Sequence, residues 1–186
     1  MIIRLADRPP QPWKNGLGRT REIAVQPPGA GMDDFLWRVS VAEVDSAAPF
    51  SAFPGIDRVI VLLDGAGFTM TLDGARTHAL TVPCTPFAFP GEAKVDVALA
   101  GGPTRDFNLM LRRGHATGGV AVWRQPGEVN GPGDVVLLHV AQGRLTTPDG
   151  TLAAGDSWRP DSRAAPPVKL ADDTVVLAVR VQAGGR

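Results

Sequence analysis

Residues 12–23, which read PWKNGLGRTREI, concentrate polar side chains and glycines in one short stretch near the N-terminus. Lys14 and Asn15 can donate hydrogen bonds to a carboxylate or a carbonyl group. Gly16 and Gly18 allow the backbone to come close to a bound molecule, because glycine has no side chain. The stretch is therefore a candidate anion-binding loop. The alternative is an N-terminal turn that leads into an edge strand and leaves Lys14 in solvent.

Polar side chains also repeat on one face of two expected strands. Arg38 and Ser40 share a parity in one strand, and Asp106 and Asn108 share a parity in a later one. The residues between them are apolar, so each strand has one polar face and one apolar face. A strand of this kind lies at the protein surface or lines a wet cavity. A cavity would bring the four side chains together.

Two arginines, Arg38 and Arg58, are expected on strands rather than on solvated loops. A buried arginine is unfavourable without a partner, so an inward-facing pair needs an internal carboxylate or a removable anionic ligand. Asp106 can compensate only part of the positive charge of the two arginines. The pattern therefore predicts a site for a small anion.

Metal and nucleophile signatures are absent from the sequence. The three histidines, His78, His115 and His139, form no H-x-H pair, and a divalent metal needs three or four converging ligands. The chain has no G-x-S-x-G motif, no cysteine next to a histidine, and no serine with a local base. We therefore expect no metal and no cofactor, and no catalytic residue can be named from a motif.

The composition is that of an ordinary globular protein. Of the 186 residues, 44% are hydrophobic and 20% are charged, and the 19 acidic residues balance the 19 basic ones. No strong field favours nucleic acid or an anionic membrane as a partner. No run approaches the roughly 20 apolar residues of a membrane span, and the N-terminus lacks a signal peptide's apolar core. With a single cysteine, Cys84, the chain fits a reducing compartment, and we expect a cytoplasmic protein.

Short apolar runs separated by glycine and proline predict an all-β chain. Asp73-Gly74 signals a tight hairpin of the primed type. No stretch has the pattern of a convincing helix. The expected strands are 35–44, 58–63, 68–72, 79–82, 95–99 and 106–112, followed by 120–123, 134–140, 145–147, 151–158 and 174–181.

The two halves of this series repeat one another. A buried strand ends at Gly65 or Gly143, and an Asp-Gly turn follows at 73–74 or 149–150. The offset is about 77 residues, which indicates a duplicated β-unit. Duplicated units of this size suggest two small antiparallel barrels or jelly rolls.

Several stretches together also carry a family likeness. They are 12–16 with Gly18, Thr20 and Glu22, then 37–40, 50–51, 53–58, 89–91, 101–103 and 106–110. On these residues the sequence resembles the HutD/Ves family, a group of bacterial bicupins. The family pattern favours three successive glycines after Asn15, and here Leu17 stands in the middle.

The resemblance implies a bicupin, two tandem cupin-like barrels, which we place at 1–115 with the motif loop and at 116–186. It implies no metal signature and a role in modulating histidine utilisation. It also implies binding of a small anionic metabolite, a carboxylate such as N-formylglutamate. The residues expected to bind it are Lys14, Asn15, Thr20, Arg38, Arg58, Asp106 and Asn108.

The leading hypothesis is a cytoplasmic, non-enzymatic protein that senses or sequesters an anionic metabolite. The alternative is a metal-independent enzyme, an isomerase or hydrolase of a related acid, with Asp106 or Glu22 as the base. A third reading is a structural or protein-interaction module, because bicupins often form homodimers. No nucleic acid or membrane partner is expected.

Overall fold

The computed structural model describes residues 1–131, 133–161 and 166–184. In this part of the chain the regular elements are strands, apart from the short 3₁₀ helix η1 (Leu5–Asp7). The prediction of an all-β chain is therefore confirmed. The chain divides into two compact units. We call Pro9–Ala116 the N-terminal unit, and Thr117–Gly184 together with Met1–Arg8 the C-terminal unit.

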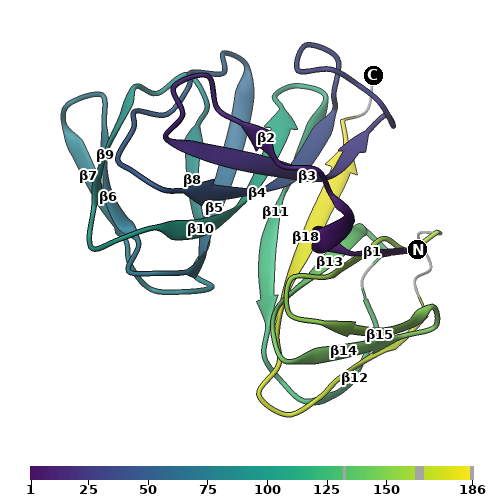
Figure 1. Ribbon diagram of the computed structural model, residues 1–186. Coiled ribbons are helices and arrows are strands. Elements are labelled where there is room, and N and C mark those ends of the chain that lie inside the picture. Colours follow the sequence, from purple (N-terminus) through teal and green to yellow (C-terminus); the bar gives the residue numbers. More distant parts are fainter. Residues whose placement is uncertain (132, 162–165, 185–186) are drawn as a thin grey trace. The chain divides into compact units, whose positions relative to one another are not determined.

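The N-terminal unit contains two antiparallel sheets (Figure 1). The larger sheet has the strand order β2-β3-β4-β10-β5-β8, and the smaller sheet has the order β7-β6-β9. The bounds are β2 (Gln11–Pro12), β3 (Gly18–Gln26), β4 (Trp37–Val44), β5 (Ile56–Asp64), β6 (Phe68–Leu72), β7 (Arg76–Leu80), β8 (Phe87–Pro90), β9 (Val95–Leu99) and β10 (Thr104–Arg112).

The hydrophobic core of this unit lies between its two sheets. Ile60 and Leu62 from β5 pack with Phe68 and Met70 from β6. These side chains sit on one face of each strand, as the alternation of period two requires. The hairpin between β6 and β7 turns at Asp73 and Gly74, whose φ angles of 51° and 68° confirm the predicted primed turn.

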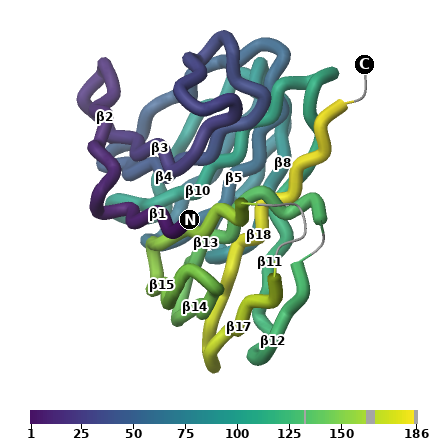
Figure 2. Tube along the Cα trace, turned by 90° about the vertical axis from the view of Figure 1, so that its right-hand side faces the viewer, coloured from purple at the N-terminus to yellow at the C-terminus, as the bar shows by residue number. Residues whose placement is uncertain are grey.

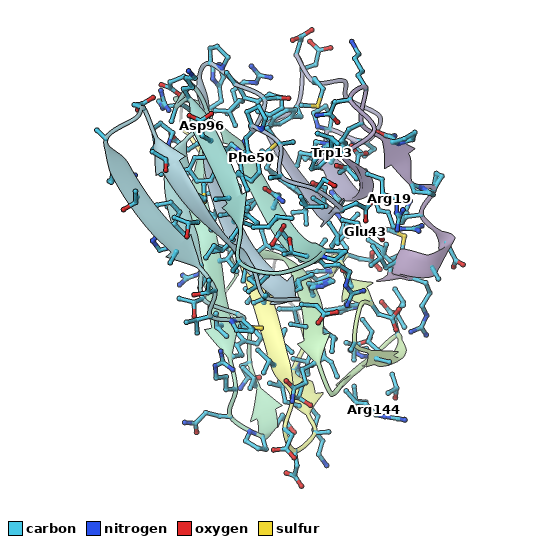
Figure 3. All side chains as sticks on the ribbon, turned by 60° about the vertical axis from the view of Figure 1, so that its left-hand side comes forward. Trp13, Arg19, Glu43, Phe50, Asp96 and Arg144 are labelled. Atoms are coloured by element: carbon cyan, nitrogen blue, oxygen red, sulfur yellow. The ribbon has the colours of Figure 1, made fainter. Side chains whose placement is uncertain are left out.

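Strand β3 was not among the strands expected from the sequence, the first of which is 35–44. We expected Thr20 in a loop, but it lies in β3, opposite Ala42 of β4. The strand was hard to see because charged residues occupy its first half. Arg19 and Arg21 both form ion pairs with Glu43 of β4, which stabilises this polar face of the pair. Figure 3 shows Arg19 beside Glu43.

The C-terminal unit also has two sheets, with the orders β1-β16-β13-β18-β11 and β12-β17-β14-β15. Figure 2 shows β14 beside β15 in this unit. The bounds are β1 (Ile2–Ile3), β11 (Ala116–Trp123), β12 (Gly127–Val129), β13 (Val135–Gln142), β14 (Arg144–Thr147), β15 (Gly150–Ala153), β16 (Ser157–Trp158), β17 (Val168–Leu170) and β18 (Val175–Ala183).

The strand orders show the internal repeat. The series β4-β10-β5-β8 corresponds to β11-β18-β13-β16, and β7-β6-β9 corresponds to β15-β14-β17. Gly65 and Gly143 occupy matching places with positive φ. A Cβ on Gly65 would lie 3.0 Å from Cα of Thr104, and one on Gly143 would lie 2.7 Å from Cα of Thr174. Both glycines are therefore required by a close approach to the start of the last strand.

The N-terminal residues differ from the expected division of the chain. From the sequence we expect residues 1–8 to belong to the first unit, 1–115. In the structure, Ile2 and Ile3 form β1 and pair with Trp158 and Ser157 of β16. This pairing is long-range, so no local pattern in the sequence could have indicated it.

Candidate functional site

A cavity of about 520 Å³ lies inside the N-terminal unit. Its walls come from one face of β3, β4, β5 and β10, and from the loops at 12–15 and 49–53. All seven residues that the sequence predicts to bind a ligand line it. They are Lys14, Asn15, Thr20, Arg38, Arg58, Asp106 and Asn108.

Strand register explains why these side chains meet. Met110 of β10 pairs with Arg38 of β4 on one side and with Arg58 of β5 on the other. Two residues earlier on β10, Asn108 lies opposite Ser40 in the same way. Because side chains two positions apart share a face, the polar positions of the neighbouring strands project to the same side.

Arg58 is the most deeply buried cation of the site, with 8% of the residue exposed. Its Nη2 donates a hydrogen bond to Oδ1 of Asn108 at 3.2 Å, while its Nε is buried without a hydrogen-bond partner. It forms no ion pair with a carboxylate among the described residues. Burial and the nearby charge of Arg38 lower the pKa of Arg58 to about 10, so the side chain remains cationic at neutral pH.

Three aromatic rings surround the Arg58 guanidinium. Its central carbon lies 5.3 Å from the ring centre of Phe50, 5.4 Å from that of Phe53 and 4.9 Å from that of Phe89. Cation–π contacts of this kind stabilise a buried guanidinium without neutralising its charge. The rings thus hold Arg58 in the cavity wall in place of a carboxylate.

These rings were not predicted as part of the site, although the stretches 50–51, 53–58 and 89–91 carry the family likeness. The loop before β5 is fixed because the Phe50 N–H donates to the carbonyl of Val95 and the Phe53 N–H donates to that of Gly91. Phe50 and Trp13 lie at the same end of this unit in Figure 3. Only the fold brings these distant segments together, so spacing alone could not reveal them.

Arg38 differs from Arg58 because it has an internal counterion. Its Nε lies 2.7 Å from Oε2 of Glu22 on the neighbouring strand β3. Glu22 is half-buried and is not among the residues that line the cavity. The ion pair therefore occupies Glu22 and partly compensates the charge of Arg38.

Asp106 is the buried acid of the cavity, with 1% of the residue exposed. The hydroxyl of Thr104 donates to its Oδ2 at 3.0 Å, and its Oδ1 is buried without a partner. Burial raises the pKa of Asp106 to about 7, although the Thr104 hydrogen bond opposes the shift. Asp106 can therefore exchange a proton near neutral pH.

The loop at the cavity entrance is ordered by its own side chains. Nε1 of Trp13 donates to Oγ1 of Thr20 at 2.8 Å, and Oδ1 of Asn15 accepts from the Leu17 N–H at 3.0 Å. Gly18 lies against the carbonyl of Glu43, where a Cβ would come within 2.6 Å. Lys14 of the same loop is exposed and is one of the residues that line the cavity.

The equivalent interior of the C-terminal unit is apolar. Asn108 pairs with Ile60 and Asp106 pairs with Leu62, whereas at the matching places Ala178 pairs with Leu138. Val176 takes the place of Asp106 and belongs, with Ala178, to the core cluster of that unit. The polar cavity is therefore a property of the N-terminal copy of the repeat.

The histidines lie on separate elements. His78 is in β7, where its ring stacks on Phe87 at a centroid distance of 3.6 Å, and His115 is exposed beyond β10. His139 is buried in β13, with Nδ1 2.9 Å from Oγ of Ser157. Among the described residues, no three histidine, cysteine or acidic side chains gather as a metal site.

No helix in the same part of the chain is long and apolar enough to span a bilayer.

Comparison with known sequences gives one family. The sequence model described as HutD matches residues 5–178. An uncharacterized 21.2 kDa protein in the hutC 3′ region of Pseudomonas putida is 43% identical over 59% of this chain and 56% of its own length. Protein Ves of Cronobacter sakazakii is 45% identical over 54% of each. The chain thus spans about half the length of the curated relatives it matches.

Solved structures give a longer match. HutD from Pseudomonas fluorescens SBW25, in a formate condition, has a TM-score of 0.86 and 30% identity, with 100% of this chain and 99% of that one covered. A variant of oxalate decarboxylase from Bacillus subtilis has a TM-score of 0.65 at 9% identity, and covers 98% of this chain and 79% of its own. This second likeness concerns the fold alone.

Proposed function

Because this chain belongs to the HutD/Ves family, we propose that it is a non-enzymatic protein that binds a small anionic metabolite and modulates histidine utilisation. The ligand is a carboxylate of the kind represented by N-formylglutamate. A relative that lies in the hutC 3′ region supports the pathway. The cavity of the N-terminal unit supports the ligand class.

The uncompensated charge of Arg58 is the observation that carries this proposal. A buried guanidinium is unfavourable unless an anion is near it. Arg58 has only a neutral amide acceptor, and its Nε points to no acceptor among the described residues. A planar carboxylate suits a guanidinium edge because two parallel N–H···O bonds can form.

The charges around Arg58 favour the same ligand. Lys14 and Arg38 line the cavity with Arg58, while Glu22 pairs with Arg38 from outside the lining. Asp106 is partly protonated near neutral pH because its pKa is raised to about 7. The cavity therefore has an excess of positive charge, which attracts an anion.

We extend the proposal to the fold and the assembly. The two units are cupin-like barrels in tandem, and the N-terminal one carries the binding site. The repeated strand order and the likeness to oxalate decarboxylase support this bicupin assignment. The protein acts in the cytoplasm without a metal or cofactor, and its partner is a small molecule rather than nucleic acid or a membrane. A homodimer is compatible with this function.

The test is a titration of the protein with N-formylglutamate by isothermal calorimetry. We expect binding to the wild type and a loss of affinity of at least about tenfold in Arg58→Ala, because a charge-assisted hydrogen bond contributes about 1.5–3 kcal/mol. Arg105→Ala is the matched control, since Arg105 lies on β10 but is exposed and does not line the cavity. Equal affinities for the two variants would place the ligand elsewhere.

One observation favours an enzyme as the second candidate. An acid with a pKa near 7 inside a cavity can take and return a proton at neutral pH, as a general base does. Asp106 is better suited to this role than Glu22, because Glu22 is held by Arg38. Incubation with N-formylglutamate, urocanate and related acids, followed by NMR, separates the two functions. Turnover of any of these acids would exclude a pure binding protein.

A further inference from the structure

Two side chains of the cavity each have a buried polar atom without a partner: Nε of Arg58 and Oδ1 of Asp106. Both residues are more than nine-tenths buried, and both line the cavity. The proposed binding of an oxyanion supplies an acceptor for Arg58. It leaves Oδ1 of Asp106 unexplained. In native proteins most buried polar atoms have a partner, so this atom indicates a second contact with the ligand.

The spacing of the two groups defines the ligand. The Arg58 side chain reaches along the sheet to Asn108, so its guanidinium lies level with residue 108 rather than with Met110, its partner in register. Asp106 is two residues farther along β10. Two strand residues rise by roughly 6–7 Å. A molecule of a few carbon atoms can therefore contact both groups at once.

The surroundings of Asp106 favour its neutral form when an anion is bound. Its neighbours in register are the apolar residues Ala42 on β4 and Leu62 on β5. Among the described residues, the hydroxyl of Thr104 is its one side-chain donor, to Oδ2. An oxyanion at Arg58 adds a second negative charge to the cavity and disfavours ionisation further. The other charges lining the cavity are Lys14 and Arg38, and Arg38 is already paired with Glu22.

We propose that Asp106 is the second anchor of this site and binds the ligand as a neutral acid, donating a proton from Oδ1 to a carbonyl or carboxyl oxygen. The ligand class is thus a compound with an oxyanion at one end, held by Arg58, and an oxygen acceptor a few atoms away. Binding takes up one proton wherever Asp106 is ionised in the free protein. This inference rests on the proposed carboxylate-binding function and adds the second contact and its proton.

The raised pKa of Asp106, about 7, sets the pH range in which ligand binding should be accompanied by proton uptake. The affinity of the wild type for a suitable ligand should be constant below this pH. Above it, the affinity should fall by roughly tenfold per pH unit, because the free protein must first gain a proton. Replacement of Asp106 by Asn keeps a donor of the same shape but removes the titration.

The experiment uses two probes of matched length. N-Formylglycine has a carboxylate and a formyl oxygen, whereas valerate has the same carboxylate and a methyl group in place of that oxygen. Dissociation constants are measured by calorimetry between pH 6 and 8.5 for the wild type and Asp106→Asn. Titrations of the wild type in two buffers with different ionisation enthalpies give the number of protons taken up, and do not depend on the folding of the variant.

We expect N-formylglycine to bind the wild type more tightly than valerate does and with uptake of about one proton above pH 7. Asp106→Asn should bind it with an affinity that varies less than about twofold over the same pH range. Equal affinity and equal proton uptake for the two probes would overturn the proposal, and so would a wild-type affinity that does not change with pH. If neither probe nor N-formylglutamate binds the wild type at any pH, the proposed function itself fails.

Discussion

The Nη2 group of Arg58 donates a hydrogen bond to Oδ1 of Asn108 across the pair formed by β5 and β10. The amide oxygen of Asn108 thus accepts a hydrogen bond from a side chain that carries a full positive charge. This contact orients the guanidinium and leaves its charge available to a ligand. A carboxylate at position 108 would instead close the site with an internal ion pair.

Asn108→Asp should therefore weaken the binding of N-formylglutamate by at least about tenfold, because a fixed negative charge repels the ligand and competes for Arg58. The matched control is Asn130→Asp, which adds the same charge at an exposed position of the C-terminal unit that does not line the cavity. Calorimetric titration of both variants measures the difference. An affinity of Asn108→Asp as high as that of the control would show that Arg58 does not bind the anion.

Arg58→Met should stabilise the ligand-free protein, because an apolar side chain of similar length removes a buried, uncompensated cation. It should also abolish the effect of the ligand. At about 100 times its dissociation constant, a ligand stabilises the wild type by roughly 2.7 kcal/mol, or a melting rise of about 5–11 °C. Thermal unfolding with and without N-formylglutamate tests both effects. A full ligand-induced rise in Arg58→Met would contradict the prediction.

The stability of the ligand-free protein should depend on pH through Asp106. Its pKa is raised to about 7 in the folded state, so the folded protein binds this proton more tightly than the unfolded chain does. The wild type should lose stability relative to Asp106→Asn as pH rises from about 4 to about 7, by up to roughly 4 kcal/mol, with no further change above. Urea unfolding of both proteins across this range gives the difference. A difference in stability between the two proteins that stays constant over this pH range would mean that Asp106 is ionised throughout it.

Gly18→Ala should destabilise the protein by about 1–3 kcal/mol, because its Cβ would overlap the carbonyl of Glu43 and the ring of Trp13. The displaced loop carries Lys14 and Asn15, so ligand affinity should fall as well. Gly31→Ala is the control, since nothing lies within 4 Å of a Cβ at that position. Urea unfolding and calorimetry measure the two effects. Equal stability of the variants would show that the loop can move freely.

The expectation that the protein has no metal site can be tested by measuring its metal content. Protein purified without a chelator should contain far less than one equivalent of zinc, iron, manganese or nickel, because the three histidines lie on separate elements and are not grouped with other ligands in the described part of the chain. Elemental analysis measures this directly. A stoichiometric metal would require a ligand set that involves other residues.

Strand parity made much of the cavity predictable from the sequence. Arg38, Asp106 and Asn108 stand on the polar faces of alternating strands, and β4 and β10 are neighbours in the sheet, so their polar faces meet. Parity alone did not reveal the counterion of Arg38. Glu22 lies in a strand whose charged first half obscured the alternation, and its position beside Arg38 depends on an irregular register between β3 and β4.

The three aromatic rings around Arg58 could not be predicted in the same way. Phe50 and Phe53 lie between two strands, and Phe89 belongs to a short strand that pairs with β5. Each position is set by contacts between segments that are distant along the chain. The pairing of β1 with β16 has the same origin. Local patterns report the period of an element, whereas long-range pairing decides which elements meet.

The apolar interior of the C-terminal unit shows how the repeated fold packs without the polar groups of the cavity. Val176 and Ala178 fill the places that Asp106 and Asn108 hold in the N-terminal unit. The repeated strand order therefore does not require Asp106 and Asn108, because aliphatic side chains can occupy the same strand positions. Substitutions at the cavity-facing positions of the N-terminal unit can thus change its polar groups without changing the strand pairing, and relatives with different ligands should differ most at these positions.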